Sequence, residues 1–390
     1  MTATAPLQHL GEIDVETFLR DYWQQKPCLF RAAFKDFVEV ISPDELAGMA
    51  CDEEVESRLL ITDPNSGQFE LRHGPFDESQ FSELPASHWS LLVQGVDHWI
   101  PEAADLVEQF RFIPSWRLDD LMISYSTPEG GVGPHYDNYD VFIIQAQGRR
   151  RWEIGGRYTE QQAEFLPDQP IRILKHWHPE QSWELEPGDM IYIPPRVGHN
   201  GVSLSDDCVN YSVGYRAPHA HELLRHLAGF CEHHSADELR FSDSTLGIRS
   251  NPGEITDADL RQVRQLLLPI LEDQQQLRRW WGELVTEPKD PQLDHSAEPI
   301  SADELGTALA QPGQVRRSEG IRFAFSCDTN HCYLFVDGEQ HRLGTNELAL
   351  VKLLCNQNSY DNSQLAEQLQ QPAAAELIAL LFERGQLYLD

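Results

Sequence analysis

Cysteine is scarce in this chain, with seven among 390 residues. The number is odd and no two cysteines stand in a Cys-x-x-Cys arrangement, so the pattern does not indicate a disulfide framework. Cys327 and Cys332 flank His331, but no further ligand accompanies them, and we expect buried free thiols rather than a zinc site. This cysteine usage predicts a reducing, cytoplasmic compartment.

Long apolar stretches are absent as well. No run approaches the roughly 20 residues that a membrane-spanning helix needs. Residues 1–23 lack the basic and apolar regions of a secretory signal. Hydrophobic residues make up 41% of the chain and charged residues 24%, which is typical of a soluble globular protein with no membrane partner.

Lysine is the rarest charged residue. Five lysines and 25 arginines face 63 acidic residues, and the net charge is −33. A surface this acidic opposes non-specific nucleic-acid binding and favours a basic partner. Adaptation to a salt-rich environment explains the same composition equally well, and both explanations stay open.

Residues 119–216 contain short apolar stretches separated by turns, without helical periodicity. This pattern favours a closed or sandwiched β-fold of the cupin or jelly-roll kind. Further strands are expected at 28–30, 57–62, 68–73 and 89–94, and helices at 12–25, from Ser42 onward and at 98–111.

Helical periodicity marks residues 221–234 and 257–285. The adjacent Trp280 and Trp281 indicate a packed core or a subunit contact, so we expect a helical dimerisation region. Residues 286–300 have the composition of a linker.

The last hundred residues have the element order of a winged helix. We expect strands at 321–326, 332–336 and 386–389, and helices at 346–356, 362–370 and 373–384. Residues 291–390 hold 6 basic and 14 acidic residues, a net charge of −8, so specific DNA binding by this region is not expected.

A histidine and a carboxylate stand two positions apart where a Gly/Pro loop enters an apolar strand. They are His135 and Asp137. In extended chain, residues i and i+2 point the same way, so both side chains project from one strand edge. A bare His-x-Asp is a common accident of composition, and only its context separates a metal site from chance.

The context is a second segment, in which a Pro-Gly-Asp turn leads into a short apolar strand, then Pro194-Pro195, then His199. In a small β-barrel such a strand can bring His199 beside His135 and Asp137. Two imidazoles and one carboxylate form the facial triad of non-haem Fe(II) oxygenases. The simpler alternative is three polar residues closing loops at a barrel rim. A rival cluster, 176–180, contains two histidines and a glutamate but has no glycine loop.

Such an iron site needs a cation for the far carboxylate of a chelating 2-oxo acid. Arg149, Arg150 and Arg151 follow the triad strand, and Arg150 faces away from its two neighbours because side chains alternate. A planar guanidinium binds a carboxylate through two parallel hydrogen bonds. The hydroxyl of Ser126 could complete this carboxylate site. A run of arginines on a solvated edge is the alternative.

Four segments resemble the JmjC-type ribosomal oxygenases, specifically the bacterial ribosomal-protein arginine hydroxylases. They are GGVGPHYDNYDVFIIQ (130–145), GRRRWEIG (148–155), EPGDMIYIPPRVGHNG (186–201) and NYSVGYRAP (210–218). The resemblance implies an α+β chain with a double-stranded β-helix JmjC core at 1–218, a helical dimerisation region at 219–290 and a winged helix at 291–390.

The resemblance also implies chemistry. It implies Fe(II) as metal, 2-oxoglutarate as cosubstrate held by Arg150 with Asn210 nearby, and a homodimer. The implied substrate is an arginine side chain of a large-subunit ribosomal protein, hydroxylated at its β-carbon. Without the resemblance, Ser126 and Asn210 are an ordinary strand hydroxyl and amide.

The strand parity of Asp120 matches that of Met122, Ser124 and Ser126, so its carboxylate can face the same cavity and hold a substrate guanidinium. Tyr139 and Ser212 are weaker candidates for this pocket. Alternatives remain: a histidyl hydroxylase or lysine demethylase with the same core, a small-molecule cupin enzyme, and a non-enzymatic winged-helix regulator.

Overall fold

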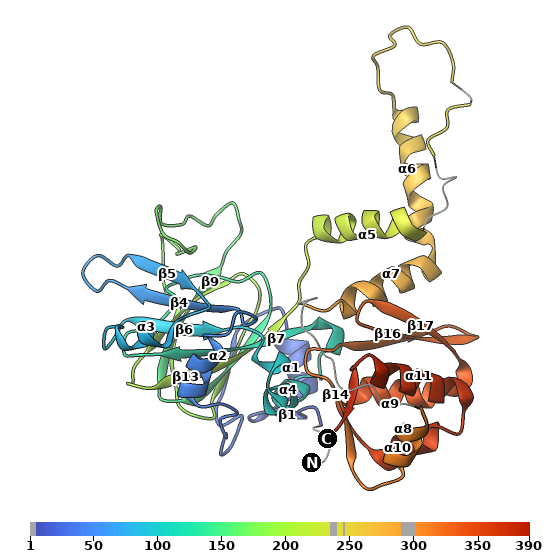
Figure 1. Ribbon diagram of the computed structural model, residues 1–390. Coiled ribbons are helices and arrows are strands. Elements are labelled where there is room, and N and C mark those ends of the chain that lie inside the picture. Colours follow the sequence, from blue (N-terminus) through green and yellow to red (C-terminus); the bar gives the residue numbers. More distant parts are fainter. Residues whose placement is uncertain (1–4, 235–239, 245, 290–301) are drawn as a thin grey trace. The chain divides into compact units, whose positions relative to one another are not determined.

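The computed structural model describes residues 5–234, 240–244, 246–289 and 302–390. The chain forms two compact units (Figure 1). The first consists of Met1–Ala217, Asp290–Ile321 and Asn356–Asp390, and the second of Pro218–Lys289 and Arg322–Cys355. The three-domain division stays a prediction, and its boundary at 290/291 lies outside the described residues. Among the helices of the described ranges, none is long and apolar enough to cross a membrane.

The first unit contains an antiparallel sheet of eight strands in the order β3-β11-β8-β13-β7-β6-β4-β5. The strands expected near residues 28, 57, 68 and 89 are confirmed as members of this sheet. Its strands are β3 Cys28–Phe30, β4 Ser57–Thr62, β5 Phe69–His73, β6 Trp89–Val93, β7 Leu118–Ser126, β8 Val141–Gln147, β11 Met190–Ile193 and β13 Cys208–Tyr215.

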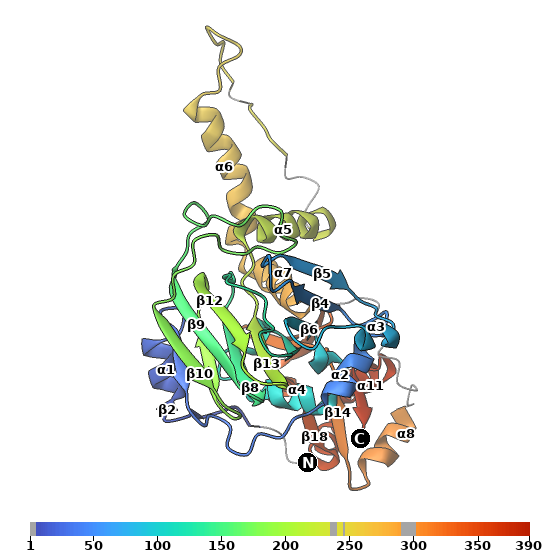
Figure 2. The ribbon, with the colours of Figure 1, turned by 90° about the vertical axis from the view of Figure 1, so that its left-hand side faces the viewer.

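A smaller sheet, in the order β10-β9-β12, faces the large one (Figure 2). Its strands are Gln181–Leu185, Arg150–Arg157 and Val197–Ser203. Side chains on the two faces of strand β8 pack into different apolar clusters. Phe142 and Ile144 belong to the main core, whereas Val141 and Ile143 pack with Trp152 and other apolar residues between the sheets. Residues 119–216 contain no helix, as expected.

Short helices cover the outer face of the large sheet, namely α1 Val15–Asp21, α2 Pro43–Met49, α3 Glu78–Ser82 and α4 Pro101–Glu108. The expected helix at 12–25 is too long. Asp14 accepts a hydrogen bond from the backbone N–H of Thr17 at 2.8 Å, and this cap starts the helix only at Val15. Phe18 of α1 is fully buried beside Phe142.

The C-terminal part of the first unit contains a three-stranded sheet, β18-β14-β19, and three helices. The elements are α8 Ala302–Leu309, β14 Gln314–Arg317, β18 Ser359–Asp361, α10 Asn362–Gln368, α11 Pro372–Glu383 and β19 Leu387–Leu389. Strand β14 is tied to α4 by two ion pairs, Arg316 to Asp105 at 2.9 Å and Arg317 to Glu108 at 2.8 Å. Helix α8 and strands β14 and β18 were not expected from the sequence.

The second unit has helices α5 Ala220–His234, α6 Asp257–Glu272 and α7 Gln274–Thr286, a sheet of β15 Phe323–Cys327, β16 His331–Val336 and β17 Glu339–Gly344, and most of α9 Leu348–Asn356. The helical stretch expected at 257–285 is interrupted at Asp273. Its extended backbone ends α6, and its carboxylate caps α7 by accepting from the N–H groups of Gln275 and Gln276.

Helix α7 packs closely on this sheet, since a Cβ atom added at Gly282 would lie 2.4 Å from the ring of Phe335. Cys327 and Cys332 are cross-strand partners with Sγ atoms 3.0 Å apart. Cys332 is buried, but the expectation of burial is wrong for Cys327, which is exposed because β15 lies at the sheet edge.

Candidate active site

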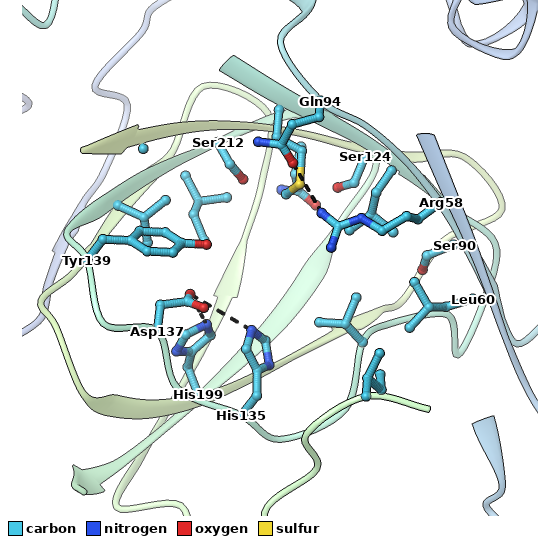
Figure 3. A pocket seen from close by; sticks show the side chains of 18 of the residues that line it. Arg58, Leu60, Ser90, Gln94, Ser124, His135, Asp137, Tyr139, His199 and Ser212 are labelled. Atoms are coloured by element: carbon cyan, nitrogen blue, oxygen red, sulfur yellow. Dashed lines mark hydrogen bonds and ion pairs between the residues drawn. The ribbon is translucent and has the colours of Figure 1, made fainter. Parts of the chain in front are cut away.

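A cavity of about 430 Å³ lies between the two sheets of the first unit. Side chains from β4, β6, β7, β8 and β13 of the large sheet and from β9 and β12 of the small sheet line it, together with the loop between β7 and β8 (Figure 3). The lining residues of β7 include Asp120, Met122, Ser124 and Ser126, the alternate set that strand parity predicts, and also Asp119 near the start of the strand.

The loop before β8 pairs with strand β12 at one position. The backbone N–H of His135 donates to the carbonyl of His199 at 3.0 Å, and the N–H of His199 donates to the carbonyl of His135 at 2.8 Å. Residues paired in this way project their side chains to the same face of the sheet. The two imidazole centroids are accordingly 4.3 Å apart, although 64 residues separate them in sequence.

Asp137 completes the cluster from the same loop. Its Oδ2 atom lies 3.6 Å from Nε2 of His199 and 4.0 Å from Nε2 of His135 (Figure 3). One atom of each residue falls within a 4.8 Å span, which is the separation expected of ligands around one ion. The structure thus brings together the three residues that the sequence singled out.

The hydrogen bonds of the two rings determine which nitrogen is available. Nδ1 of His135 lies 2.8 Å from the carbonyl of Gly133, and Nδ1 of His199 lies 3.0 Å from that of Val197. A carbonyl only accepts, so each Nδ1 carries the hydrogen and each Nε2 presents its lone pair toward Asp137. Burial, and then the neighbouring His135, lowers the pKa of His199 to about 4, which keeps its ring neutral.

Arg150 differs sharply from its neighbours in the arginine run. Arg149 is half exposed and 3.8 Å from Glu184, and Arg151 lies 3.7 Å from Glu153 on the solvated side. Arg150 is only 4% exposed and lines the cavity. It donates to the hydroxyl of Ser126, its Nε has no hydrogen-bond partner, and no carboxylate within the described part of the chain pairs with it.

The side chain of Asn210 also lies in the cavity wall, fully buried on β13. Its amide nitrogen donates to the side-chain oxygen of Gln145 at 2.7 Å. Ser126 contacts the hydroxyl of Ser90 at 2.7 Å in addition to Arg150. Ser126 is therefore part of a polar group beside Arg150, whereas Asn210 is committed to Gln145 in this structure.

Asp120 is buried elsewhere in the cavity wall and accepts a hydrogen bond from the amide of Gln94 at 2.7 Å. The amide oxygen of Gln94 in turn accepts from Arg58 at 3.1 Å (Figure 3). The sequence pattern did not single out Gln94 and Arg58. Strands at 57–62 and 89–94 were expected, but the face of each strand that meets the cavity was not assigned.

Tyr139 and Ser212 line the cavity as well. Figure 3 shows the hydroxyl of Tyr139 directed inward, near Asp137. The negative charge of Asp137, and then burial, raise the pKa of Tyr139, so its hydroxyl stays protonated. Ser212 is opposite Met122 in the register of β13 and β7, which places it on the face that carries Asp120.

The rival cluster at 176–180 does not form a comparable site. His176 lies at the surface, 3.5 Å from Glu164, and Trp177 donates to Glu153 at 3.3 Å. Across the residues with described positions, His135, Asp137 and His199 are the one group of three or more such side chains whose donor atoms converge. This donor set, two imidazoles and a carboxylate, fits a divalent iron.

Two family models match the chain. A JmjC domain matches residues 105–223, and a ROXA-like winged helix matches residues 269–388. The cavity described above lies largely within the first match. The expected fold class, a double-stranded β-helix core with a winged helix after it, is confirmed by these matches together with the solved structures below.

The chain is similar along its length to bacterial proteins. It is 35% identical over 379 residues to the ribosomal protein uL16 3-hydroxylase of Escherichia coli, covering 96% of this chain and 97% of that protein. It is 34% identical to a probable ribosomal oxygenase of Haemophilus influenzae, covering 86% of this chain and 81% of the relative.

Solved structures agree with these matches. A crystal structure of E. coli YcfD superimposes with a TM-score of 0.88 and 32% identity, covering 98% of this chain and all of that one. A structure of YcfD in complex with cobalt and 2-oxoglutarate gives a TM-score of 0.84 at 32% identity, with 96% and 97% covered. With the fold, the converging donor atoms and these full-length matches together, the chain belongs to the JmjC-type ribosomal oxygenases.

Proposed function

We propose that this protein is an Fe(II)- and 2-oxoglutarate-dependent hydroxylase that acts on the β-carbon of an arginine side chain in a large-subunit ribosomal protein. One observation carries the proposal: three converging metal-ligand atoms face the same cavity as a buried arginine, Arg150, whose Nε has no hydrogen-bond partner among the described residues. The uL16 3-hydroxylase activity named for the E. coli relative supports the substrate class.

His135, Asp137 and His199 would hold the iron. Three protein ligands leave further coordination positions for the cosubstrate and oxygen. Bound iron supplies, with O2 and 2-oxoglutarate, the oxidising power to hydroxylate an unactivated C–H bond. The protein's own contribution is to hold both imidazoles correctly rotated through the carbonyls of Gly133 and Val197, while burial keeps His199 neutral.

Arg150 would bind the far carboxylate of 2-oxoglutarate. A buried guanidinium with an unpartnered Nε carries a large desolvation cost, and an anion in the cavity relieves it. Ser126 and Ser90 add hydroxyls beside it. Asn210 lines the same cavity and donates to Gln145. The family resemblance implies that it lies near the cosubstrate.

Asp120 would receive the guanidinium of the substrate arginine, with Tyr139 and Ser212 as neighbouring walls. A buried guanidinium needs a carboxylate or several acceptors, because an unpaired charge is expensive to desolvate. The net charge of −33 also favours the approach of a basic ribosomal protein.

The iron-loaded enzyme should be tested with an arginine peptide from a ribosomal protein, with product mass and 2-oxoglutarate consumption followed together. Wild-type enzyme is expected to add one oxygen atom to the arginine. Asp120→Asn should depress hydroxylation far more than uncoupled 2-oxoglutarate decay, whereas Asp44→Asn, on an exposed helix turn, serves as the matched control. A peptide with lysine in place of the substrate arginine should not react, because an ammonium cannot donate two parallel hydrogen bonds to a carboxylate as the planar guanidinium does.

Two results would redirect this proposal. Efficient hydroxylation of a histidine peptide, with the arginine peptide inert, would place the enzyme with the histidyl hydroxylases. Equal loss of coupled and uncoupled turnover in Asp120→Asn would assign Asp120 to structure rather than to substrate.

The proposed assembly is a homodimer formed through the helices of the second unit, and the proposed compartment is the cytoplasm, where ribosomal proteins are made. Helix α6 exposes one apolar face, which consists of Leu260, Val263, Leu267 and Leu271. Trp280 and Trp281 of α7 are only partly buried. A second copy of the chain would cover such a face, and light scattering at low micromolar concentration tests this.

A further inference from the structure

We infer that Gln94, anchored by Arg58, is a positioning residue that holds Asp120 ready for the substrate guanidinium and keeps Arg58 from neutralising it. This inference rests on the proposed function, since it concerns the same arginine pocket. It assigns a role to two residues that neither bind the metal nor are required by the chemistry of the cosubstrate.

The three side chains come from neighbouring strands of the large sheet. Arg58 is on β4 and Asp120 on β7, and Gln94 follows β6, which pairs with both of those strands. All three line the cavity. Arg58 donates to the amide oxygen of Gln94 at 3.1 Å, and the amide nitrogen of Gln94 donates to Oδ2 of Asp120 at 2.7 Å.

The chemistry of the two neighbours determines how the Gln94 amide is oriented. A guanidinium only donates, so the amide oxygen must face Arg58. An ionised carboxylate only accepts, so the amide nitrogen must face Asp120. The amide is thus a polar spacer with its negative end toward the cation and its positive end toward the anion, and both charged groups stabilise the same orientation.

The spacer matters because both charges act within one small space. Arg58 and Asp120 line the same cavity, together with Tyr139. Direct contact with Asp120 would let Arg58 form the bidentate ion pair that the substrate arginine is proposed to form. The amide N–H of Gln94 uses only one of the about four acceptor sites of a carboxylate.

Gln94→Met removes both hydrogen bonds while keeping the length and volume of the side chain. The Gln94 amide bridges Arg58 and Asp120, and once it is lost the flexible arginine is expected to turn onto the carboxylate. The KM for the arginine peptide should rise about tenfold, the size of one lost charge-assisted hydrogen bond. Gln94→Asn, whose shorter amide cannot bridge the two groups, should act in the same way and replaces Gln94→Met if that variant does not fold.

The decisive test is the double variant. Arg58→Met alone frees the Gln94 amide and should raise the KM about threefold. If Arg58 is the competitor, adding Arg58→Met to Gln94→Met removes it, and the KM should return to about threefold above wild type. A glutamine that only fills space would instead give independent losses, about thirtyfold in the double variant. Gln68→Met, on the exposed turn between β4 and β5, controls for the exchange itself.

Recovery in the double variant supports the inference. An unchanged KM in both Gln94 variants, or additive losses in the double variant, overturns it. These results are distinct from failure of the proposed function, which would appear as wild-type enzyme that turns over 2-oxoglutarate but hydroxylates no arginine peptide.

Discussion

The β-rich core buries its apolar residues, whereas a helix of the second unit leaves several of its apolar residues exposed. In the core, strand β8 is buried along almost its whole length, with Phe142 and Ile144 on one face and Val141 and Ile143 on the other. On helix α6, four apolar residues at i, i+3, i+7 and i+11 are 58%, 43%, 52% and 46% exposed, and they are Leu260, Val263, Leu267 and Leu271. Figure 1 shows α6 extending beyond α5 and α7.

This difference shows which part of the chain buries its apolar residues within a single copy. The two sheets cover each other and one chain supplies all three converging ligand atoms, so the metal-ligand cluster needs no second copy of the chain. A helix with one long exposed apolar stripe normally buries it against another surface. We therefore expect changes in the core to affect catalysis and changes on α6 to affect assembly, and four experiments test this separation.

The largest effect is expected from Asp137→Ala. Loss of the only carboxylate among the three ligands should abolish 2-oxoglutarate turnover and reduce bound iron, while the dimer mass and circular dichroism stay as in wild type. His135→Ala should behave alike. Metal analysis of the purified variants, together with activity, measures this. Full activity in Asp137→Ala would exclude the proposed triad.

The next effect concerns assembly. Leu260→Asp with Leu267→Asp places charges on the exposed stripe of both protomers and should convert the dimer to a monomer at low micromolar concentration. Each leucine contributes about 1.5–3 kcal/mol when buried. Light scattering measures the mass, and bound iron should remain. Gln265→Asp, exposed on the same helix, is the charge control. A monomeric wild type would contradict the proposed dimer.

Within the core, Arg150→Ala should raise the apparent KM for 2-oxoglutarate about ten- to a hundredfold. The loss corresponds to about 1.5–3 kcal/mol, the contribution of a hydrogen bond to a charged group. Arg149→Ala removes a half-exposed arginine from the adjacent position and should leave this KM nearly unchanged. The reverse pattern would move the carboxylate anchor by one residue.

The smallest effect compares packing in the two regions. Ile144→Val should lower the free energy of unfolding by about 0.5–1.5 kcal/mol, because it leaves a small cavity in a closed core. Leu271→Val, in the monomeric background with both Leu260→Asp and Leu267→Asp, should change it by less than about 0.5 kcal/mol, because the side chain is already half exposed. Denaturant titrations of both variants give the comparison, and equal losses would show that α6 is covered within one chain.

The sequence by itself determined the features that depend on local spacing. Alternation along a strand predicted that Asp120 shares a face with Ser126 and that Arg150 points away from Arg149, and the structure agrees for both. The absence of helical period predicted the β-rich core. Local spacing also predicted the apolar periodicity at 257–285, but not the break at Asp273, because that break depends on a side chain capping the next helix.

Only the tertiary structure decided which distant residues meet. The meeting of His135 and His199 depends on the backbone pairing of a loop with β12, and the cavity contacts of Arg58 and Gln94 depend on the order β7-β6-β4 in the sheet. Strand order and register come from packing over the whole core, whereas a sequence pattern reports only which face a side chain occupies on its own strand. The same limit applies to Arg150, whose burial in the cavity wall appears only once the facing sheet is in place.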